Sequence, residues 1–426
     1  MHYVWQHRLF PSSNLQTVDG RRITVINPGR HNTDAGPDFF NATVKIDDHT
    51  WVGNIEIHVK ASDWYRHKHD TDAAYDSVIL HVVDIDDTTV KRPDGQVIPQ
   101  LRLPCSSMLN SDFHALADSA PHSLPCAQRL SEIKPIHITD WITSLGYERL
   151  LAKADRLTGL LKHLNGDWET TAFAAISRAL GFGVNNEPFE MLARAIEPVI
   201  MRKCAHSLLS AEALLLGQAG FLESFRPGDG SYGSKLREEY LFLRNKFELS
   251  GPLRLNWKMS RMRPGNTPQR RLATLAHIVV RGEGSLMSKF IDAETVETLR
   301  GIFTESLTGF WANHYTLTGA QTQPTPGMSV AAADILIINA VVPLLHAYGT
   351  LTGQLHFHDR AIRILELLKP EANHITKLFD ACGIKCNDAF SSQALIHLRR
   401  EYCERQKCLY CRIGHRLLST RALRNV

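Results

Sequence analysis

The chain has 426 residues, of which 43% are hydrophobic and 22% are charged, and its formal net charge is +4. These fractions are typical of a globular protein and exclude a disordered or fibrous one, and the length predicts two or three domains. The charge is uneven, since residues 1–100 carry 14 acidic and 10 basic side chains while the other 326 residues carry 30 acidic and 38 basic ones. An acidic first part suits metal chemistry, and a basic remainder suits a polyanionic partner.

No apolar run reaches the roughly 18 to 20 residues that cross a bilayer. The longest run, at 330–345, contains Asp334, Asn339 and Pro343 and predicts a buried helix. The N-terminus has no basic segment followed by an apolar one, as a signal peptide would. We therefore expect no membrane partner and a cytoplasmic location.

The first hundred residues alternate between apolar and polar side chains, as strands do. The elements predicted after a leading helix at 3–10 are strands at 22–26, 41–46 and 51–60, a short helical or irregular segment at 62–75, and strands at 77–83 and 96–103. Ser62 is the expected N-cap of the segment after the third strand, and Asp94-Gly95 is a hairpin signal. The order is helix, three strands, helix, strand and a further strand.

From about Ile138 the apolar residues recur every three or four positions, which predicts helices. We therefore expect an α+β protein, with a small mixed α/β domain followed by a large all-helical body. The predicted parts are the α/β domain at 1–110, a linker at 111–136, a helical domain at 137–380 and a Cys-rich helical segment at 381–426.

Acidic and basic side chains gather around the third strand. Asp38 precedes the second strand, and Glu56, His58 and Lys60 share one face of the third because strand side chains alternate. Two carboxylates can hold Mg²⁺ or Mn²⁺, and a nearby base and a cation complete what phosphodiester hydrolysis needs. We predict that these four residues are catalytic and that Asp38 and Glu56 bind the ion.

At these residues the domain resembles the PD-(D/E)xK nuclease superfamily over roughly residues 1–100. That superfamily has the order helix, three strands, helix and strand, with Asp on its second strand and Glu-x-Lys on its third. Here His58 stands at the lysine position, and Lys60 lies one pleat further along. The resemblance implies a metal-dependent nuclease acting on nucleic acid. Because His58 is about 7 Å and Lys60 about 13 Å from Glu56 along a strand, we expect His58 to contribute more.

A second group of candidate ligands follows directly: His67, His69, Asp70, Asp72, Asp76 and His81. This density is also typical of a zinc or iron hydrolase centre acting on a substrate other than nucleic acid. Within the group we expect His81, inside an apolar strand, to be structural. A third hypothesis is a noncatalytic nucleic-acid-binding or scaffold protein with a degenerate nuclease-like domain, in which Glu56 and Lys60 face solvent and Asp38 is a turn residue.

The whole chain also resembles a family of uncharacterised bacterial proteins that share a conserved domain of unknown function. The stretches that carry this resemblance are 35–39, 59–69 with Ser62-Asp63-Trp64, and 392–396. The resemblance spans nearly the full length and implies no activity.

Five of the eight cysteines lie in the last 45 residues, which favours metal binding over a disulfide framework. Cys403-x4-Cys408-x2-Cys411 has the short spacing that lets thiolates share one centre. We predict Zn²⁺ or an iron–sulfur cluster there. The candidates for a fourth ligand are Cys382, Cys386 and His415.

The stretch 254–271 contains six basic residues, one tryptophan and no acidic residue. Spaced cations grip phosphates, and an aromatic ring stacks on a base. The predicted nucleic-acid contacts are Arg254, Trp257, Lys258, Arg261, Arg263, Arg270 and Arg271. The alternative is an ordinary solvated face.

Overall fold

The computed structural model describes residues 1–10, 15–32, 34–92, 94–103, 123–260, 262–324 and 327–424. The chain forms two compact units, one made of Met1–Trp141 with Leu398–Val426 and the other of Ile142–His397. Residues 398–426 therefore belong with the α/β part, whereas residues 381–397 belong to the helical unit. No local sequence pattern encodes this long-range grouping. Residues 111–122 of the predicted linker lie outside the described residues.

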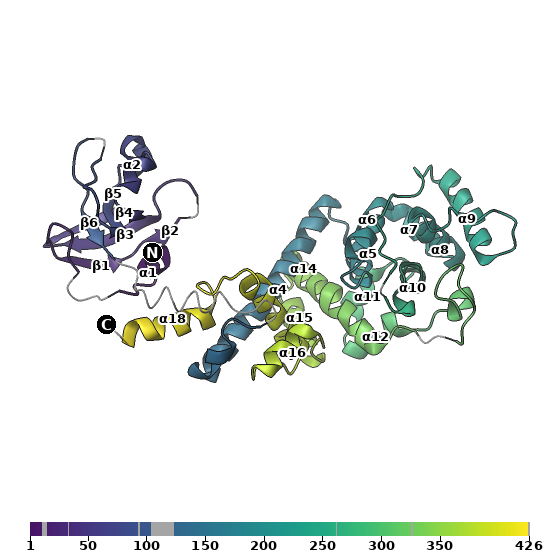
Figure 1. Ribbon diagram of the computed structural model, residues 1–426. Helices are drawn as coiled ribbons and strands as arrows, with labels where there is room; N and C mark the ends of the chain where they lie inside the picture. The colour runs from purple at the N-terminus through teal and green to yellow at the C-terminus, as the bar shows by residue number, and fades with distance from the viewer. Residues whose placement is uncertain are drawn as a thin grey trace. The chain divides into compact units, whose positions relative to one another are not determined.

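The first unit contains a mixed sheet of six strands (Figure 1). The strand order is β1 (Ile23–Asn27), β3 (Phe39–Ile46), β4 (His49–Lys60), β5 (Val78–Ile85) and β6 (Gln100–Arg102), and β2 (Arg30–His31) pairs with β3. β1, β3 and β4 are antiparallel neighbours, whereas β5 runs parallel to β4 and β6 parallel to β5. The α+β fold is thereby confirmed.

Short helical elements surround this sheet. α1 (His2–Gln6) precedes it, and α2 (Asp63–Arg66), η1 (His69–Thr71) and η2 (Ala73–Tyr75) connect β4 to β5. The predicted order of helix, three strands, helix, strand and a further strand is present, with the short β2 in addition. Because β4 lies in the middle of the sheet, its residues 55–58 are buried on both faces.

Two local details differ from the sequence predictions. Ser62 stands before α2 but does not cap it with its side chain; its N–H and hydroxyl donate to Asp87 at 2.8 and 2.7 Å. Val59, whose side chain alternates with those of His58 and Lys60 and so lies on the opposite face of β4, is 57% exposed because it is near the strand's end.

The Asp94-Gly95 turn is present, with Gly95 at φ 84°, but it does not pair β6 with β5 as a hairpin. The turn joins an isolated bridge between Lys91 and Val97. β6 instead pairs in parallel with β5, which requires a crossover connection. The signal therefore predicts the local bend and not the partner strand.

The second unit is helical. α4 (Pro135–His163) runs across the unit boundary. The further helices are α5 (Trp168–Leu180), α6 (Asn186–Ala195), α7 (Pro198–Cys204), α8 (Leu208–Gln218), α9 (Tyr232–Lys246), α10 (Pro268–Arg281), α11 (Leu286–Asp292), α12 (Val296–Thr304), α13 (Val330–Leu336), α14 (Val342–Thr352), α15 (His356–Leu367), α16 (His374–Ala381) and α17 (Ala389–His397).

The apolar run at 330–345 is a buried helix, as predicted. α13, a π-helical stretch at Ile337–Val341 and α14 form it together. Val330–Thr352 is the one helix, among the described residues, that is long and apolar enough to cross a membrane, and 72% of its apolar window is buried inside the protein. Its polar interruption Asp334 is bound by Arg300 of α12 through two bonds of 2.7 and 2.9 Å.

A candidate metal centre on the central strand

The carboxyl groups of Asp38 and Glu56 lie together where β3 begins beside β4. The Ile57 N–H donates to Asp38 Oδ2 at 2.9 Å, and the Asp38 N–H donates to Glu56 Oε2 at 3.1 Å. The antiparallel register, which sets Phe39 opposite Ile55, causes this approach. The two residues predicted to share an ion are thus brought together by strand pairing.

Three imidazoles adjoin these carboxyl groups. The ligand nitrogens of His58, His67 and His69 all lie within 4.8 Å of one another. Glu56 Oε1 is 3.2 Å from His69 Nε2 and 3.5 Å from His58 Nε2. The predicted carboxyl pair and the imidazoles of the second predicted group, His67 and His69, therefore form a single site.

The chain reaches this geometry through a reversal between β4 and η1. His67 ends α2, and Lys68 follows it in the left-handed region at φ 63°. This turn leads directly into His69 at the start of η1. Both imidazoles consequently approach His58, although they are separated by one residue only.

His81 on β5 supports the cluster from within the sheet. Its Nε2 is 2.9 Å from His58 Nδ1, because the parallel register of β4 and β5 sets His81 opposite Glu56. Tyr75 stacks on His69 with ring centroids 3.8 Å apart. Such second partners fix the orientation of ligating imidazoles, and the prediction of a structural His81 fits this packing.

His2 on α1 also reaches the site, which sequence reasoning missed. Its Nε2 is 3.0 Å from Asp38 Oδ2. No local motif signals this contact, because it depends on the way a short helix packs against the start of β3.

The electrostatics of the cluster favour neutral imidazoles. Burial, together with the neighbouring charge of Asp38, raises the pKa of Glu56 to about 8. Burial, His69 and His67 lower the pKa of His58 to about 4. Burial opposes ionisation of Asp38, but the hydrogen bond and charge of His2 outweigh it and lower the pKa of that carboxyl. A neutral imidazole keeps the lone pair that a metal ion requires.

The donor set suits a transition-metal ion. Imidazole nitrogens are preferred by zinc and iron, whereas carboxylate and water oxygens are preferred by Mg²⁺ and Mn²⁺. A site with three imidazoles beside two carboxyl groups fits an ion that accepts both ligand types. By its imidazoles this donor set fits zinc or iron better than Mg²⁺ or Mn²⁺.

The remaining acidic and basic candidates near the cluster have other surroundings. Lys60 is exposed at the end of β4, and its N–H donates to Asp63 Oδ2 at 3.3 Å. Asp72 is exposed and accepts a hydrogen bond of 2.9 Å from the Ala74 N–H, by which it caps the start of η2. Asp76 is exposed and Asp70 is half-buried.

Two of the predicted nucleic-acid contacts are buried in the helical unit. Arg270 donates to the backbone oxygens of Trp311 and His314. Arg271 donates to Asn266, and burial lowers its pKa to about 10. These two guanidinium groups hold the loop segments around the start of α10.

The rest of the basic stretch divides between packing and solvent. Trp257 donates from Nε1 to the Ala219 oxygen at 3.0 Å and packs its ring against Phe189 and Phe221. Arg261 lies outside the described residues. The exposed members are Arg254, Lys258 and Arg263.

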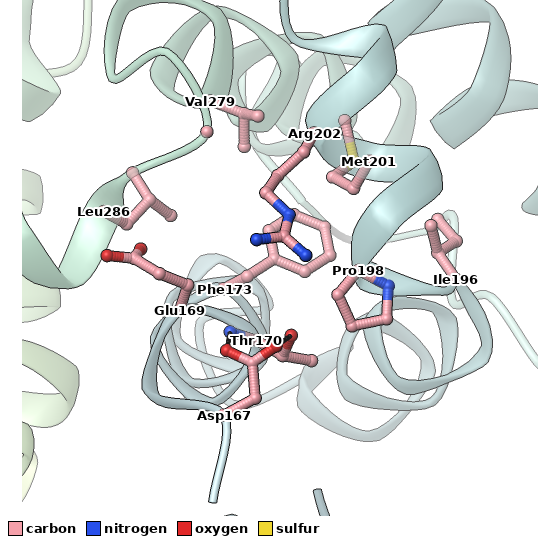
Figure 2. A pocket seen from close by; sticks show the side chains of 11 residues that line it. Asp167, Glu169, Thr170, Phe173, Ile196, Pro198, Met201, Arg202, Val279 and Leu286 are labelled. Atoms are coloured by element: carbon pink, nitrogen blue, oxygen red, sulfur yellow. Dashed lines mark hydrogen bonds between the residues drawn. The ribbon is translucent and has the colours of Figure 1, made fainter.

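Two carboxylates, Asp167 and Glu169, line a small cavity in the helical unit (Figure 2). Both accept hydrogen bonds from backbone N–H groups at the start of helices. Asp167 accepts from the Thr170 N–H at 3.1 Å and caps α5. Glu169 accepts from the Met287 N–H at 2.9 Å, at the start of α11. Hydrogen bonds of these two carboxylates therefore go to backbone N–H groups, which gives both residues a structural role.

The three cysteines predicted to bind metal near the C-terminus all lie in the first unit. They line one cavity and are Cys403, Cys408 and Cys411. Two of the proposed fourth ligands, Cys382 and Cys386, belong to the second unit.

Comparisons with known proteins give one match. The model of a family described as "Protein of unknown function (DUF2851)" matches residues 1–374. No curated protein and no solved structure matches the chain. The matched range contains the carboxyl and imidazole cluster and ends before Cys403.

Proposed function

The chain belongs to the DUF2851 family, whose description assigns no function, and we propose from its own site that it is a metal-dependent phosphodiesterase acting on nucleic acid. One observation carries the proposal: the carboxyl groups of Asp38 and Glu56 meet the clustered imidazoles of His58, His67 and His69. The resemblance to PD-(D/E)xK nucleases in the order of elements supports the same chemistry.

Each group has a part in this proposal. A bound divalent ion supplies a Lewis acid and lowers the pKa of a coordinated water. Glu56, His58 and His69, which are buried, hold the ion, and Asp38 completes the carboxylate pair. His67 is the exposed imidazole of the three. A substrate arriving from solvent meets it first, so His67 is the group that exchanges a proton with substrate or water.

A second candidate function rests on the same three imidazoles. A histidine-rich centre also suits hydrolysis of esters or amides that are not part of a nucleic acid. Both functions need the same ion and the same ligands, so only the substrate separates them. The noncatalytic alternative predicts no turnover of either class.

The test is cleavage of single- and double-stranded DNA and RNA by the purified chain with Mn²⁺, Zn²⁺ or Mg²⁺. We expect cleavage that needs a divalent ion and falls at least roughly 100-fold in Glu56→Gln and Asp38→Asn. The matched control is Asp76→Asn, which removes an exposed carboxylate nearby. Absence of cleavage with all three ions, or full activity in Glu56→Gln, would overturn the proposal. Turnover of ester substrates alone would support the second function.

A further inference from the structure

Four cysteines enclose a cavity in the first unit. Cys126, Cys403, Cys408 and Cys411 line it. Cys126 precedes η3 (Ala127–Glu132), and the other three belong to the stretch between η7 (Leu398–Cys403) and α18 (Arg412–Arg424). None of the four is joined in a disulfide among the described residues, and Cys408 and Cys411 are buried. The sequence motif supplies three of these residues, and the fold adds Cys126 from more than 270 positions earlier.

Backbone contacts hold the two segments around this cavity. Arg399 Nη1 donates to the Ser123 oxygen at 2.8 Å, and Arg129 Nη2 donates to the Leu417 oxygen at 3.0 Å. Gly414 lets α18 approach the cysteine turn, because a Cβ at this position would lie 2.2 Å from the Cys408 oxygen. The cysteines are thus gathered by specific contacts from both segments.

Four buried or half-buried thiols therefore line one cavity. Thiolates are the ligands that zinc and iron–sulfur clusters prefer, so this lining is a ligand set for such a metal centre.

We propose that Cys126, Cys403, Cys408 and Cys411 together ligate one metal centre, which is a zinc ion or an iron–sulfur cluster. Cys126 takes the fourth position that the sequence left open. Another candidate for that position, His415, has its Nδ1 2.7 Å from the Tyr3 hydroxyl.

The lining of this cavity fits two kinds of metal centre. Four thiolates can bind a single zinc ion or an iron–sulfur cluster, and the metal content of the protein separates the two. This centre shares no residue with the Asp38 and Glu56 site.

The test is the metal content of the full-length chain, purified without oxygen and without chelators. We expect either about one zinc per chain, or iron and acid-labile sulfide in equal amounts, at about two or about four of each per chain, with the visible absorption of a cluster. Cys126→Ser should lose at least about two thirds of that metal, whereas Cys382→Ser, a half-buried thiol of the second unit, should keep it.

A second measurement uses the unaltered protein and covers the case in which Cys126→Ser does not fold. In the native chain, Cys126, Cys403, Cys408 and Cys411 should resist alkylation and should become reactive together when the metal is removed. Full metal content in a folded Cys126→Ser variant, or alkylation of Cys126 while the metal stays bound, would overturn the ligand set. Absence of both zinc and iron from the native protein would overturn the site.

Discussion

His58 lies at the middle of the cluster, and the structure separates its role from that of Lys60. His58 is 7% exposed and borders Glu56 and His81, while Lys60 is exposed at the end of β4. We expect His58→Ala to lower divalent-dependent turnover at least roughly 100-fold, because it removes a ligand. Lys60→Ala, the matched control on the same strand, should stay within about threefold of the unaltered protein. Steady-state rates at saturating ion decide, and a larger loss for the lysine variant would reverse the assignment.

Glu212 on α8 is a titrating group in the helical unit, far in sequence from the cluster. It is fully buried and accepts bonds from Tyr232 at 2.7 Å and Trp311 at 2.9 Å, and His277 Nδ1 is 3.7 Å from its other oxygen. Burial raises its pKa from 4.5 to about 7. The folded state thus prefers the protonated form. Its contribution to stability is complete below about pH 4.5 and is lost as the pH rises through about 7.

We therefore expect the helical unit to lose about 3 kcal/mol of unfolding free energy at this residue between pH 4.5 and pH 9. Glu212→Gln should remove most of that dependence, because it keeps an acceptor oxygen and cannot ionise. The control is Glu297→Gln, whose side chain is 78% exposed. Denaturant unfolding at both pH values measures the effect, and an unchanged pH profile in Glu212→Gln would contradict it.

Alternation along one strand was enough to predict that Glu56 and His58 share a face, and the meander order was enough to place Asp38 beside them. The joining of His69 to the same site was not predictable. It depends on a left-handed backbone at Lys68, and nothing in a lysine signals that conformation. His2 was missed for a different reason, since its contact exists only once α1 packs on the sheet.

At the scale of elements, the paired Arg300 and Asp334 join α12 to α13. Asp334 is mostly buried, and both of its oxygens are bound by the guanidinium. Without Asp334, Arg300 keeps the exposed Glu297, at 3.5 Å, as an acidic partner, and this solvated carboxylate compensates the guanidinium charge less well. We expect Asp334→Ala to lower the unfolding free energy by roughly 2 to 4 kcal/mol. The double variant Arg300→Leu with Asp334→Leu should recover part of this loss. Urea unfolding of the three proteins checks it, and equal loss in single and double variants would argue against a charge effect.

The spacing of apolar residues predicted strands and helices because a residue's place on the buried or exposed face of its own element depends on local sequence. The buried helix at 330–345 followed from an apolar run with a few polar breaks, and the structure confirms it. The parallel pairing of β6 was not predictable, because the turn at Asp94-Gly95 fixes only the bend. The partner of a strand depends on the register of the whole sheet.

At the scale of the whole molecule, the C-terminal helix belongs to the unit that begins the chain. Leu417 and Leu418 of α18 are buried, at 1% and 0% exposure. We expect Leu418→Ala to lower the stability of the first unit by about 2 to 4 kcal/mol and to leave the helical unit unchanged. The control is Leu355→Ala, whose side chain is 68% exposed. Hydrogen exchange resolved by segment reports on both units, and a loss of protection confined to 142–397 would contradict the grouping.

Local patterns could not have predicted this grouping, because they contain no information on contacts between the first and last parts of a chain. The cysteine motif shows the limit clearly. Its three members were recognised from spacing, whereas Cys126 is isolated in sequence and joins them only through the fold.

α1 places consecutive residues in contact with two different sites. His2 pairs with Asp38, and the Tyr3 hydroxyl is 2.7 Å from His415 Nδ1, four positions after Cys411. Any rotation of this five-residue helix therefore changes both contacts. Suppose that filling the cysteine site shifts α1 and changes the affinity for a divalent ion at Glu56. Binding of that ion must then change the metal affinity of the cysteine site by the same factor, because coupling between two sites is reciprocal. Titrating the divalent ion into protein with the cysteine site filled and with it emptied measures this linkage, and Tyr3→Phe should weaken it.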